Sequence, residues 1–146
     1  MMILELAALL CTGLFAGAAL YVSLVEHPAR LEGGPALAIA QFGPSYRRGA
    51  VMQASLAGGG CLAAVAAWVQ GSPTPVLIAG VLLGSLIPFT LIVILPTNKR
   101  LLDARLDPNA PETITLLGRW GRLHAVRSVV GAAAFLLLGL PRGGIL

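Results

Sequence analysis

The chain has 146 residues, of which 57% are hydrophobic and only 11% are charged. A soluble domain carries about 25% charged residues, so this composition excludes an ordinary soluble globular protein. The mean hydropathy of +0.86 points the same way. The formal net charge is +4, but the basic residues flank long apolar stretches, where anionic lipid headgroups would meet them. We therefore expect the lipid bilayer, and no nucleic acid, as a partner.

The first apolar stretch has the features of a membrane span. It lacks the basic segment of a secretory signal and carries Glu5 instead, so we expect it to remain in the membrane. The two cysteines, Cys11 and Cys61, lie inside apolar stretches, and a disulfide framework needs more cysteines and a loop-rich chain. We interpret both as packing residues.

Four apolar stretches are long enough to cross the hydrocarbon core, which needs about 20 residues. No stretch alternates as a strand would, and a helix is the other structure that satisfies every backbone polar group in lipid. One domain is expected at this length. The sequence therefore predicts an all-α fold, a transmembrane four-helix bundle, in a single domain over residues 1–146. The expected spans cover about residues 3–25, 50–69, 75–95 and 123–140.

Prolines mark the expected span boundaries. Pro28 should end the first span, and Pro96 follows the third. Thr74 and Pro75 suit the N-cap and the first helical position of the third span. Pro88 falls inside that span and should kink it.

Basic residues gather in the two segments that follow the first and third spans, whereas the turn at 71–74 has none. By the positive-inside rule these two long loops are cytoplasmic and both termini face outward. Even these two loops are short for a membrane protein, and together with the many Ala, Gly and Arg residues they favour a bacterial inner membrane. The basic residues in question are Arg30, Arg47, Arg48, Lys99, Arg100, Arg105, Arg119 and Arg122.

Small residues occur in every span and let membrane helices approach closely, within one chain or between copies in a homo-oligomer. The first span has Gly13 and Gly17, and the third has Gly80 and Gly84. Steps of three and four residues from these glycines, and from Gly60 and Gly131 in the other spans, should stay on one helix face. They lead to the polar residues at the cytoplasmic end, namely His27, Gln53, Asn98, Trp120, His124 and Arg127.

This polar cluster is the candidate site, because polar groups near a membrane interior are costly and usually face the bundle or a wet cavity. We expect His27 and His124 to converge. Neutral imidazoles could ligate a transition metal or haem, with Glu26 or Asn98 as a further ligand. One histidine could instead act as a general base with Arg127 stabilising the anion, or both could relay protons. The candidate cofactor-binding residues are His27, His124, Trp120, Arg48 and Gln53.

Simpler roles stay open for several of these residues. His27 could touch headgroups at the interface, Trp120 could be an aromatic anchor, and Asn98 could be a helix C-cap. The sequence contains no HExxH, CxxC or CxxCH motif, so a metal or haem site rests on the convergence of the histidines alone.

Several motifs, spread over most of the chain, carry a family resemblance. They are the segment from Gly17 to the Glu26-His27-Pro28 turn, Tyr46-Arg47-Arg48 leading to Gln53, Pro88-Phe89-Thr90, the run from Pro96 to Leu101, and a W-x3-H-x2-R set formed by Trp120, His124 and Arg127. With these motifs the chain resembles the anthrone oxygenase-like family of small four-helix membrane proteins. The resemblance implies oxidation of anthrones to anthraquinones with molecular oxygen, and an active cluster of His27, Asn98, His124 and Arg127.

That chemistry agrees with the residues. An anthrone has an acidic CH2 between aromatic rings, and a base that removes its proton leaves a carbanion that can react with oxygen. A bound metal or haem would instead activate oxygen directly. We therefore expect a membrane-embedded oxygenase or oxidoreductase for a small lipophilic substrate, anthrone-like or otherwise aromatic.

Two other classes remain. One is a non-enzymatic haem- or metal-binding membrane protein. The other is a small transporter or an assembly subunit. Four-helix multidrug exporters use a carboxylate deep in the first span, whereas Glu5 and Glu26 lie near its two edges, which disfavours a transporter.

Overall fold

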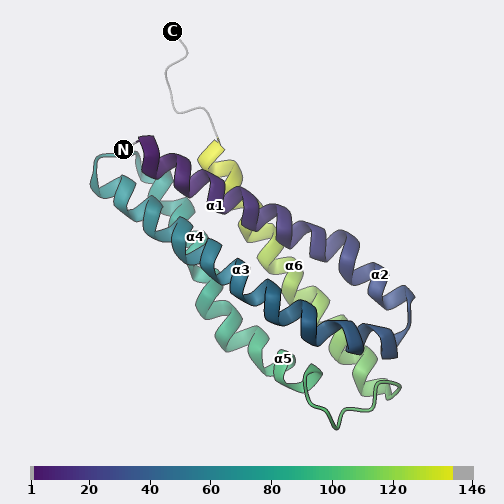
Figure 1. The fold of residues 1–146 in the computed structure, drawn as a ribbon. Coiled ribbons are helices and arrows are strands. Elements are labelled where there is room, and N and C mark those ends of the chain that lie inside the picture. The colour runs from purple at the N-terminus through teal and green to yellow at the C-terminus, as the bar shows by residue number, and fades with distance from the viewer. Residues whose placement is uncertain (1, 140–146) are drawn as a thin grey trace.

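The computed structural model describes residues 2–139 and contains four antiparallel helical rods (Figure 1). All four are long and apolar enough to span a membrane, which confirms the predicted all-α fold. The first rod consists of α1 (Met2–Tyr21), η1 (Val22–Glu26) and α2 (His27–Glu32). The second rod is α3 (Pro35–Val69), the third consists of α4 (Thr74–Phe89), η2 (Thr90–Ile94) and α5 (Leu95–Leu101), and the fourth is α6 (Pro111–Gly139).

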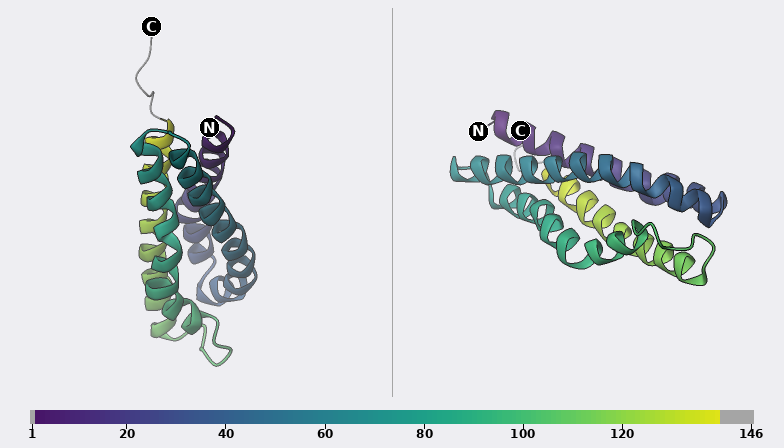
Figure 2. Two further views of the ribbon diagram at one scale, coloured as in Figure 1. Left: turned by 90° about the vertical axis from the view of Figure 1, so that its left-hand side faces the viewer. Right: turned by 60° about the horizontal axis from the view of Figure 1, so that its bottom comes forward.

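Each rod packs mainly against two others. Helix α1 lies against α3 and α6, and α4 lies against the same two helices, so α3 and α6 face each other diagonally across the bundle. The start of α1, the α3–α4 turn and the end of α6 lie at one end of the bundle. The α2–α3 turn and the α5–α6 loop lie at the other (Figures 1 and 2). We call the latter the basic end, because it carries Arg47, Arg48, Lys99 and Arg100.

The outer surface of the bundle is apolar. Large hydrophobic side chains are exposed on all four rods, and a continuous surface of this kind is unfavourable in water. The outward faces therefore contact lipid, and the chain is an integral membrane protein. Examples of these exposed residues are Leu6, Leu14, Leu24, Val51, Leu62, Val69, Ile92, Val129 and Leu136.

The helices are longer than the predicted spans. Helix α3 has 35 residues, about 52 Å at 1.5 Å per residue, and so exceeds a hydrocarbon core of about 30 Å. The predicted long loop after the first span is wrong, because only Gly33 and Gly34 separate α2 from α3, with a positive φ of 88° at Gly34. Hydropathy indicates which part of a helix lies inside lipid, but it does not show how far the helix continues outside the lipid. The predicted end of the fourth span, residue 140, lies outside the described residues.

Neither Pro28 nor Pro96 ends its rod, contrary to prediction. A five-residue π-helical segment precedes each: η1 leads into His27-Pro28, and η2 leads into Leu95-Pro96. A proline ring in an α-helix clashes with the carbonyl four residues earlier, and a wider π turn provides another way to continue the chain. Both rods therefore extend beyond their prolines, to Glu32 and Leu101.

Close helix packing occurs at some of the predicted glycines and not at others. A Cβ atom on Gly80 would lie 2.5 Å from the Cβ of Ala64, and one on Gly131 would lie 2.9 Å from the Phe15 ring. Gly17, by contrast, is exposed and would meet nothing within 4 Å. The predicted packing face through Gly17 is therefore wrong, because Gly17 faces outward. The extra residue in the η1 turn also changes the helical register, so steps of three and four residues from Gly13 do not keep the buried His27 on the face of Gly17.

Candidate functional site

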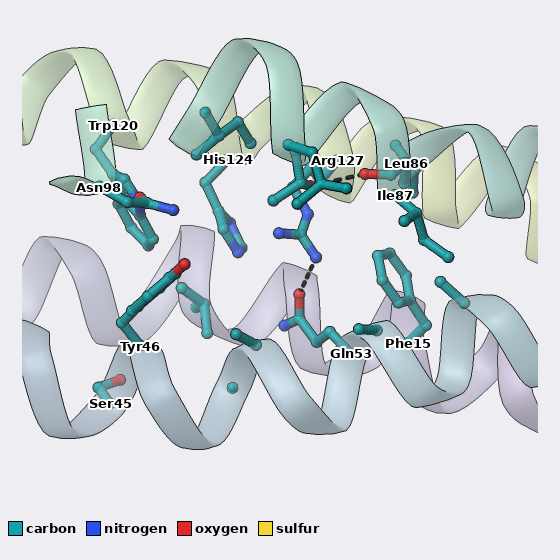
Figure 3. Close-up of a pocket in the computed structure, with 18 of the residues that line it drawn as sticks. Phe15, Ser45, Tyr46, Gln53, Leu86, Ile87, Asn98, Trp120, His124 and Arg127 are labelled. Carbon is teal, nitrogen blue, oxygen red and sulfur yellow. Dashed lines mark hydrogen bonds between the residues drawn. The ribbon is translucent and has the colours of Figure 1, made fainter. Parts of the chain in front are cut away.

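A cavity of about 180 Å³ lies between α3 and α6, toward the basic end, with walls from all four rods (Figure 3). Both π segments contribute to it, through Val22 of η1 and through Thr90, Leu91 and Ile94 of η2. π turns occur frequently at functional sites. The polar and aromatic residues of the wall are Phe15, Arg30, Phe42, Ser45, Tyr46, Gln53, Thr90, Asn98, Trp120, His124 and Arg127.

One face of α6 supplies three of these side chains. Trp120, His124 and Arg127 are spaced by four and three residues, which places them on the same side of a helix. The Trp120 and His124 rings stack with centroids 4.8 Å apart and an interplanar angle of 26°. His124 is 4% exposed, and its side chain extends from α6 into the cavity (Figure 3).

Two serines form hydrogen bonds at the Nδ1 edge of the His124 ring. The Oγ of Ser23 lies 3.0 Å from His124 Nδ1 and 2.8 Å from the Oγ of Ser128. Ser128 in turn lies 2.9 Å from the backbone oxygen of Ala19. These contacts connect the first rod to α6 through buried or half-buried polar atoms.

Arg127 is the unpaired charge of the site. Its guanidinium donates a hydrogen bond of 2.6 Å to the amide oxygen of Gln53 and lies 5.5 Å from the centre of the Phe15 ring. Its Nε atom is buried without a partner. Within residues 2–139 no carboxylate forms an ion pair with it, so its positive charge is available to an anion in the cavity.

A second arginine was not predicted as a site residue. Arg30 is 3% exposed, forms an ion pair with Glu26, and donates a hydrogen bond of 3.3 Å to Ser45. The Ser45 hydroxyl donates to the same Glu26 carboxylate at 2.6 Å, and the guanidinium lies 5.8 Å from the Trp120 ring centre. The sequence signal was the spacing of four between Glu26 and Arg30. Because its charge is neutralised, Arg30 differs from Arg127.

The predicted metal ligands do not assemble. Among the described residues there is no group of three or more His, Cys, Asp or Glu side chains that could hold a metal ion. Glu26 is instead engaged by Arg30 and Ser45. His27 is buried behind the cavity wall, with its ring 5.0 Å from Trp120, and its Nδ1 atom has no partner. The indole of Trp120 therefore contacts both imidazoles.

Two further predicted residues have different positions. Asn98 is 1% exposed and lines the cavity, and its Oδ1 atom is buried without a partner. It does not cap a helix end with its side chain, because α5 continues to Leu101. Arg48 is exposed on α3 and is not part of the cavity wall, so the structure does not bring it to the site.

The cavity is rich in aromatic side chains, although the chain is not. Four of the eight aromatic residues line it: Phe15, Phe42, Tyr46 and Trp120. Phe42 and Tyr46 are stacked at 5.8 Å, and Phe42 meets Trp120 edge to face at 5.4 Å. Sequence reasoning missed Phe15 and Phe42, and the signal for Phe42 was its spacing of four from Tyr46.

Two residues of the cavity wall also reach the outer surface of the bundle. Ala54 of α3 and Leu91 of η2 both line the cavity and are nevertheless exposed, Leu91 by 59%. The residues of α3 near this opening are small, including Gly49, Ala50 and Ala54. From their exposure we infer an opening between Ala54 and Leu91, toward the apolar outer surface of the bundle, and call it the lateral mouth.

Comparison with known proteins places this arrangement in a family. The family model described as anthrone oxygenase matches residues 42–137. The anthrone oxygenase tpcL of Aspergillus fumigatus is 35% identical over 138 residues, an alignment that covers 87% of this chain and 86% of that protein. No solved structure matches the chain. Both matches extend over most of the sequence, and the family model includes the cavity-lining residues of α6. The chain therefore belongs to the anthrone oxygenase family.

Proposed function

We propose that this chain oxidises a flat, lipophilic anthrone-like substrate with molecular oxygen inside the cavity between α3 and α6. The observation that carries the proposal is the pairing of an imidazole, His124, with an uncompensated guanidinium, Arg127, one helical turn away in an aromatic-walled cavity. Membership of the anthrone oxygenase family supports the same class of reaction.

In the first step His124 acts as the general base. It accepts a proton from the CH2 group between the substrate's aromatic rings, and the electron pair of the broken C–H bond moves toward the ring carbonyl. The carbonyl oxygen then carries the negative charge of an enolate. Arg127, oriented by Gln53, supplies the positive charge that stabilises this anion in a site of low dielectric constant.

In the second step the carbanion carbon is oxidised by molecular oxygen. A C–O bond forms to give a peroxide on that carbon, and loss of water from the peroxide leaves a carbonyl group. One oxygen atom of O2 becomes the new carbonyl oxygen, and the other leaves as water with the two hydrogens of the original CH2. The four electrons lost by the carbon equal the four gained by O2.

These steps use only the side chains of this protein. The described residues do not bring three metal-ligating groups together, and the two imidazoles contact the Trp120 indole. The aromatic side chains Phe15, Phe42, Tyr46 and Trp120 provide faces on which a planar ring system can stack.

The lateral mouth offers the substrate a path from the bilayer. A lipophilic ring system concentrates in the hydrocarbon, and the exposed Ala54 and Leu91 lie on the outward surface of the bundle. We therefore propose that substrate enters between α3 and η2 without crossing water.

The experiment is an oxidation assay on protein purified in mild detergent. Anthrone is supplied in air, and anthraquinone formation and oxygen uptake are followed for the wild type, His124→Ala and the control Arg119→Gln, which changes an exposed residue on the same helix. We expect a loss of about 100-fold or more in kcat for His124→Ala, with Arg119→Gln at the wild-type rate. An absorption spectrum and metal analysis of the same samples accompany the assay. Absence of turnover by the folded wild type, or full activity of His124→Ala, would overturn the proposal.

A further inference from the structure

The hydrogen bonds behind His124 determine which of its two ring nitrogens can accept a proton. We infer that Ser23 and Ser128 fix the neutral His124 ring in the tautomer that carries its proton on Nδ1, which leaves Nε2 as the proton-accepting atom of the ring. The two serines are thus positioning residues. Their catalytic meaning rests on the proposed function, whereas the tautomer itself does not.

The argument starts at Ser128, which has one proton to donate. Its Oγ lies 2.9 Å from the backbone oxygen of Ala19 and 3.3 Å from that of His124. Carbonyl oxygens can only accept. The 2.9 Å contact with the Ala19 oxygen is a hydrogen bond only if Ser128 donates the proton. The Ser128 Oγ is then left as an acceptor for other donors.

The next hydroxyl in the chain is Ser23. Its Oγ lies 2.8 Å from the Ser128 Oγ, and one of the two must donate. Because the Ser128 proton is used at a carbonyl, Ser23 is the donor in this pair. The Ser23 Oγ then has only lone pairs to offer to its other neighbour.

That other neighbour is Nδ1 of His124, at 3.0 Å. With no proton left on Ser23, the bond requires a proton on Nδ1. A neutral imidazole carries one proton on its two nitrogens, so Nε2 keeps a free lone pair. Each of the three groups, Nδ1, Ser23 and Ser128, then donates once, and the chain of hydrogen bonds ends on a backbone oxygen.

The opposite direction of donation is less favourable. If Ser128 donated to Ser23 and Ser23 donated to Nδ1, the Ser128 Oγ would face the Ala19 carbonyl at 2.9 Å with no proton between two acceptors. Ser128 is 3% exposed and His124 is 4% exposed, so water has little access to relieve that contact. An unsatisfied buried polar contact of this kind is unfavourable, because no other partner replaces the lost hydrogen bond.

The stacked Trp120 ring holds the plane of the imidazole, with the ring centroids 4.8 Å apart and an interplanar angle of 26°. Rotation of the imidazole by half a turn would preserve this stacking but would move Nδ1 away from Ser23, so the Ser23 hydrogen bond selects the orientation. The proton acceptor of the proposed reaction is thus assigned to a single atom, Nε2 of His124.

Nitrogen NMR tests the tautomer directly, because the chain has only two histidines. Protein labelled with 15N-histidine is compared with a labelled His27→Gln variant, which leaves the signals of His124 alone. The couplings of the ring nitrogens to the ring carbon-bound protons identify the protonated atom. We expect Nδ1 protonated and Nε2 unprotonated in His124 of the neutral ring. A proton on Nε2 would overturn the inference.

Serine variants make the test specific. Ser128→Ala removes the acceptor for Ser23, whose hydroxyl is then free to donate to Nδ1, so the tautomer should shift toward protonated Nε2. Ser23→Thr keeps the hydroxyl and should retain the wild-type tautomer. Ser85→Ala, which removes an exposed hydroxyl bonded only to Leu82, is the control for folding in detergent. An unchanged His124 spectrum in Ser128→Ala would also overturn the inference.

Activity provides the second readout. In Ser128→Ala we expect kcat for anthrone oxidation to fall by about 100-fold with KM little changed, and Ser85→Ala to match the wild type. The two proposals fail separately. A wild type that shows the expected tautomer but no anthrone turnover would end the proposed function alone, and turnover with Nε2 protonated would end the tautomer assignment alone.

Discussion

Arg127 of α6 donates a 2.6 Å hydrogen bond to Gln53 of α3, two residues on rods that face each other diagonally across the bundle. The bond fixes the one cavity arginine that has no carboxylate partner in the part of the chain that the structure describes. Gln53 is 4% exposed, so a neutral amide holds the guanidinium without cancelling its charge.

Gln53→Glu should therefore lower activity while keeping the bundle intact. A carboxylate in place of the amide would form an ion pair with Arg127 and reduce the positive charge available to an enolate. We expect kcat for anthrone oxidation to fall by about tenfold or more, with thermal stability in detergent at or above that of the wild type. Steady-state kinetics and thermal unfolding of the same preparation measure both effects. An unchanged kcat would show that the charge of Arg127 is not used.

Asn98 should contribute to recognition of hydroxylated substrates. Its buried Oδ1 has no partner in the protein and lies in the cavity wall, so a hydroxyl group on the substrate can donate to it. Asn98→Leu should raise KM for a hydroxylated anthrone by about tenfold, the equivalent of one hydrogen bond of about 1.5 kcal/mol. The same variant should bind unsubstituted anthrone about as well as the wild type does. Equal changes in KM for the two substrates would contradict this role.

The lateral mouth should be closed by a large side chain at position 54. Ala54→Trp would place an indole between α3 and η2, and kcat/KM for anthrone should fall by about tenfold or more. The control is Leu62→Trp, which changes an exposed residue of the same helix and should leave kcat/KM unchanged. The measurement uses protein in lipid nanodiscs, so that substrate is delivered from the bilayer. Wild-type kcat/KM in Ala54→Trp would direct the search for an entrance to another side.

The stability of the bundle should depend on the small size of Gly80 and should not depend on that of Gly17. A Cβ on Gly80 would overlap the Cβ of Ala64 and lie 3.4 Å from the Cys61 backbone oxygen, whereas Gly17 has nothing within 4 Å. Gly80→Leu should destabilise the bundle by about 1–3 kcal/mol, and Gly17→Leu should leave its stability unchanged. Thermal unfolding of both variants in the same detergent compares them. Equal stabilities would contradict the packing described for α3 and α4.

The sequence predicted the parts of the site that lie on uninterrupted helices. Trp120, His124 and Arg127 share one face because α6 is α-helical over its whole length, and Gln53 is on the buried face of α3 that includes Gly60. The stepping from Gly13 to His27 failed because η1 adds a residue to one turn. A π turn depends on how a proline is accommodated in the folded bundle, and hydrophobic periodicity carries no sign of it.

Arg30 shows a second limit of sequence reasoning. The sequence analysis used Arg30 as one of the basic residues that indicate which loops are cytoplasmic. In the structure it is buried between Glu26, Ser45 and Trp120. Ser45 comes from α3, 15 positions away, and no local pattern shows that it will satisfy Arg30 and Glu26. The lengths of the rods were underestimated for a related reason, because hydropathy reports lipid contact and α3 continues beyond it.

The central claim, that His124 removes a proton from the substrate's CH2 group, is tested most directly without oxygen. Anthrone is incubated anaerobically with protein in D2O buffer, and exchange of its CH2 hydrogens for deuterium is followed by proton NMR against buffer alone. The account predicts that the wild type and Arg119→Gln accelerate exchange, and that His124→Ala does not. A wild type that oxidises anthrone in air yet gives no exchange above the buffer rate, or a His124→Ala variant that exchanges at the wild-type rate, would contradict it.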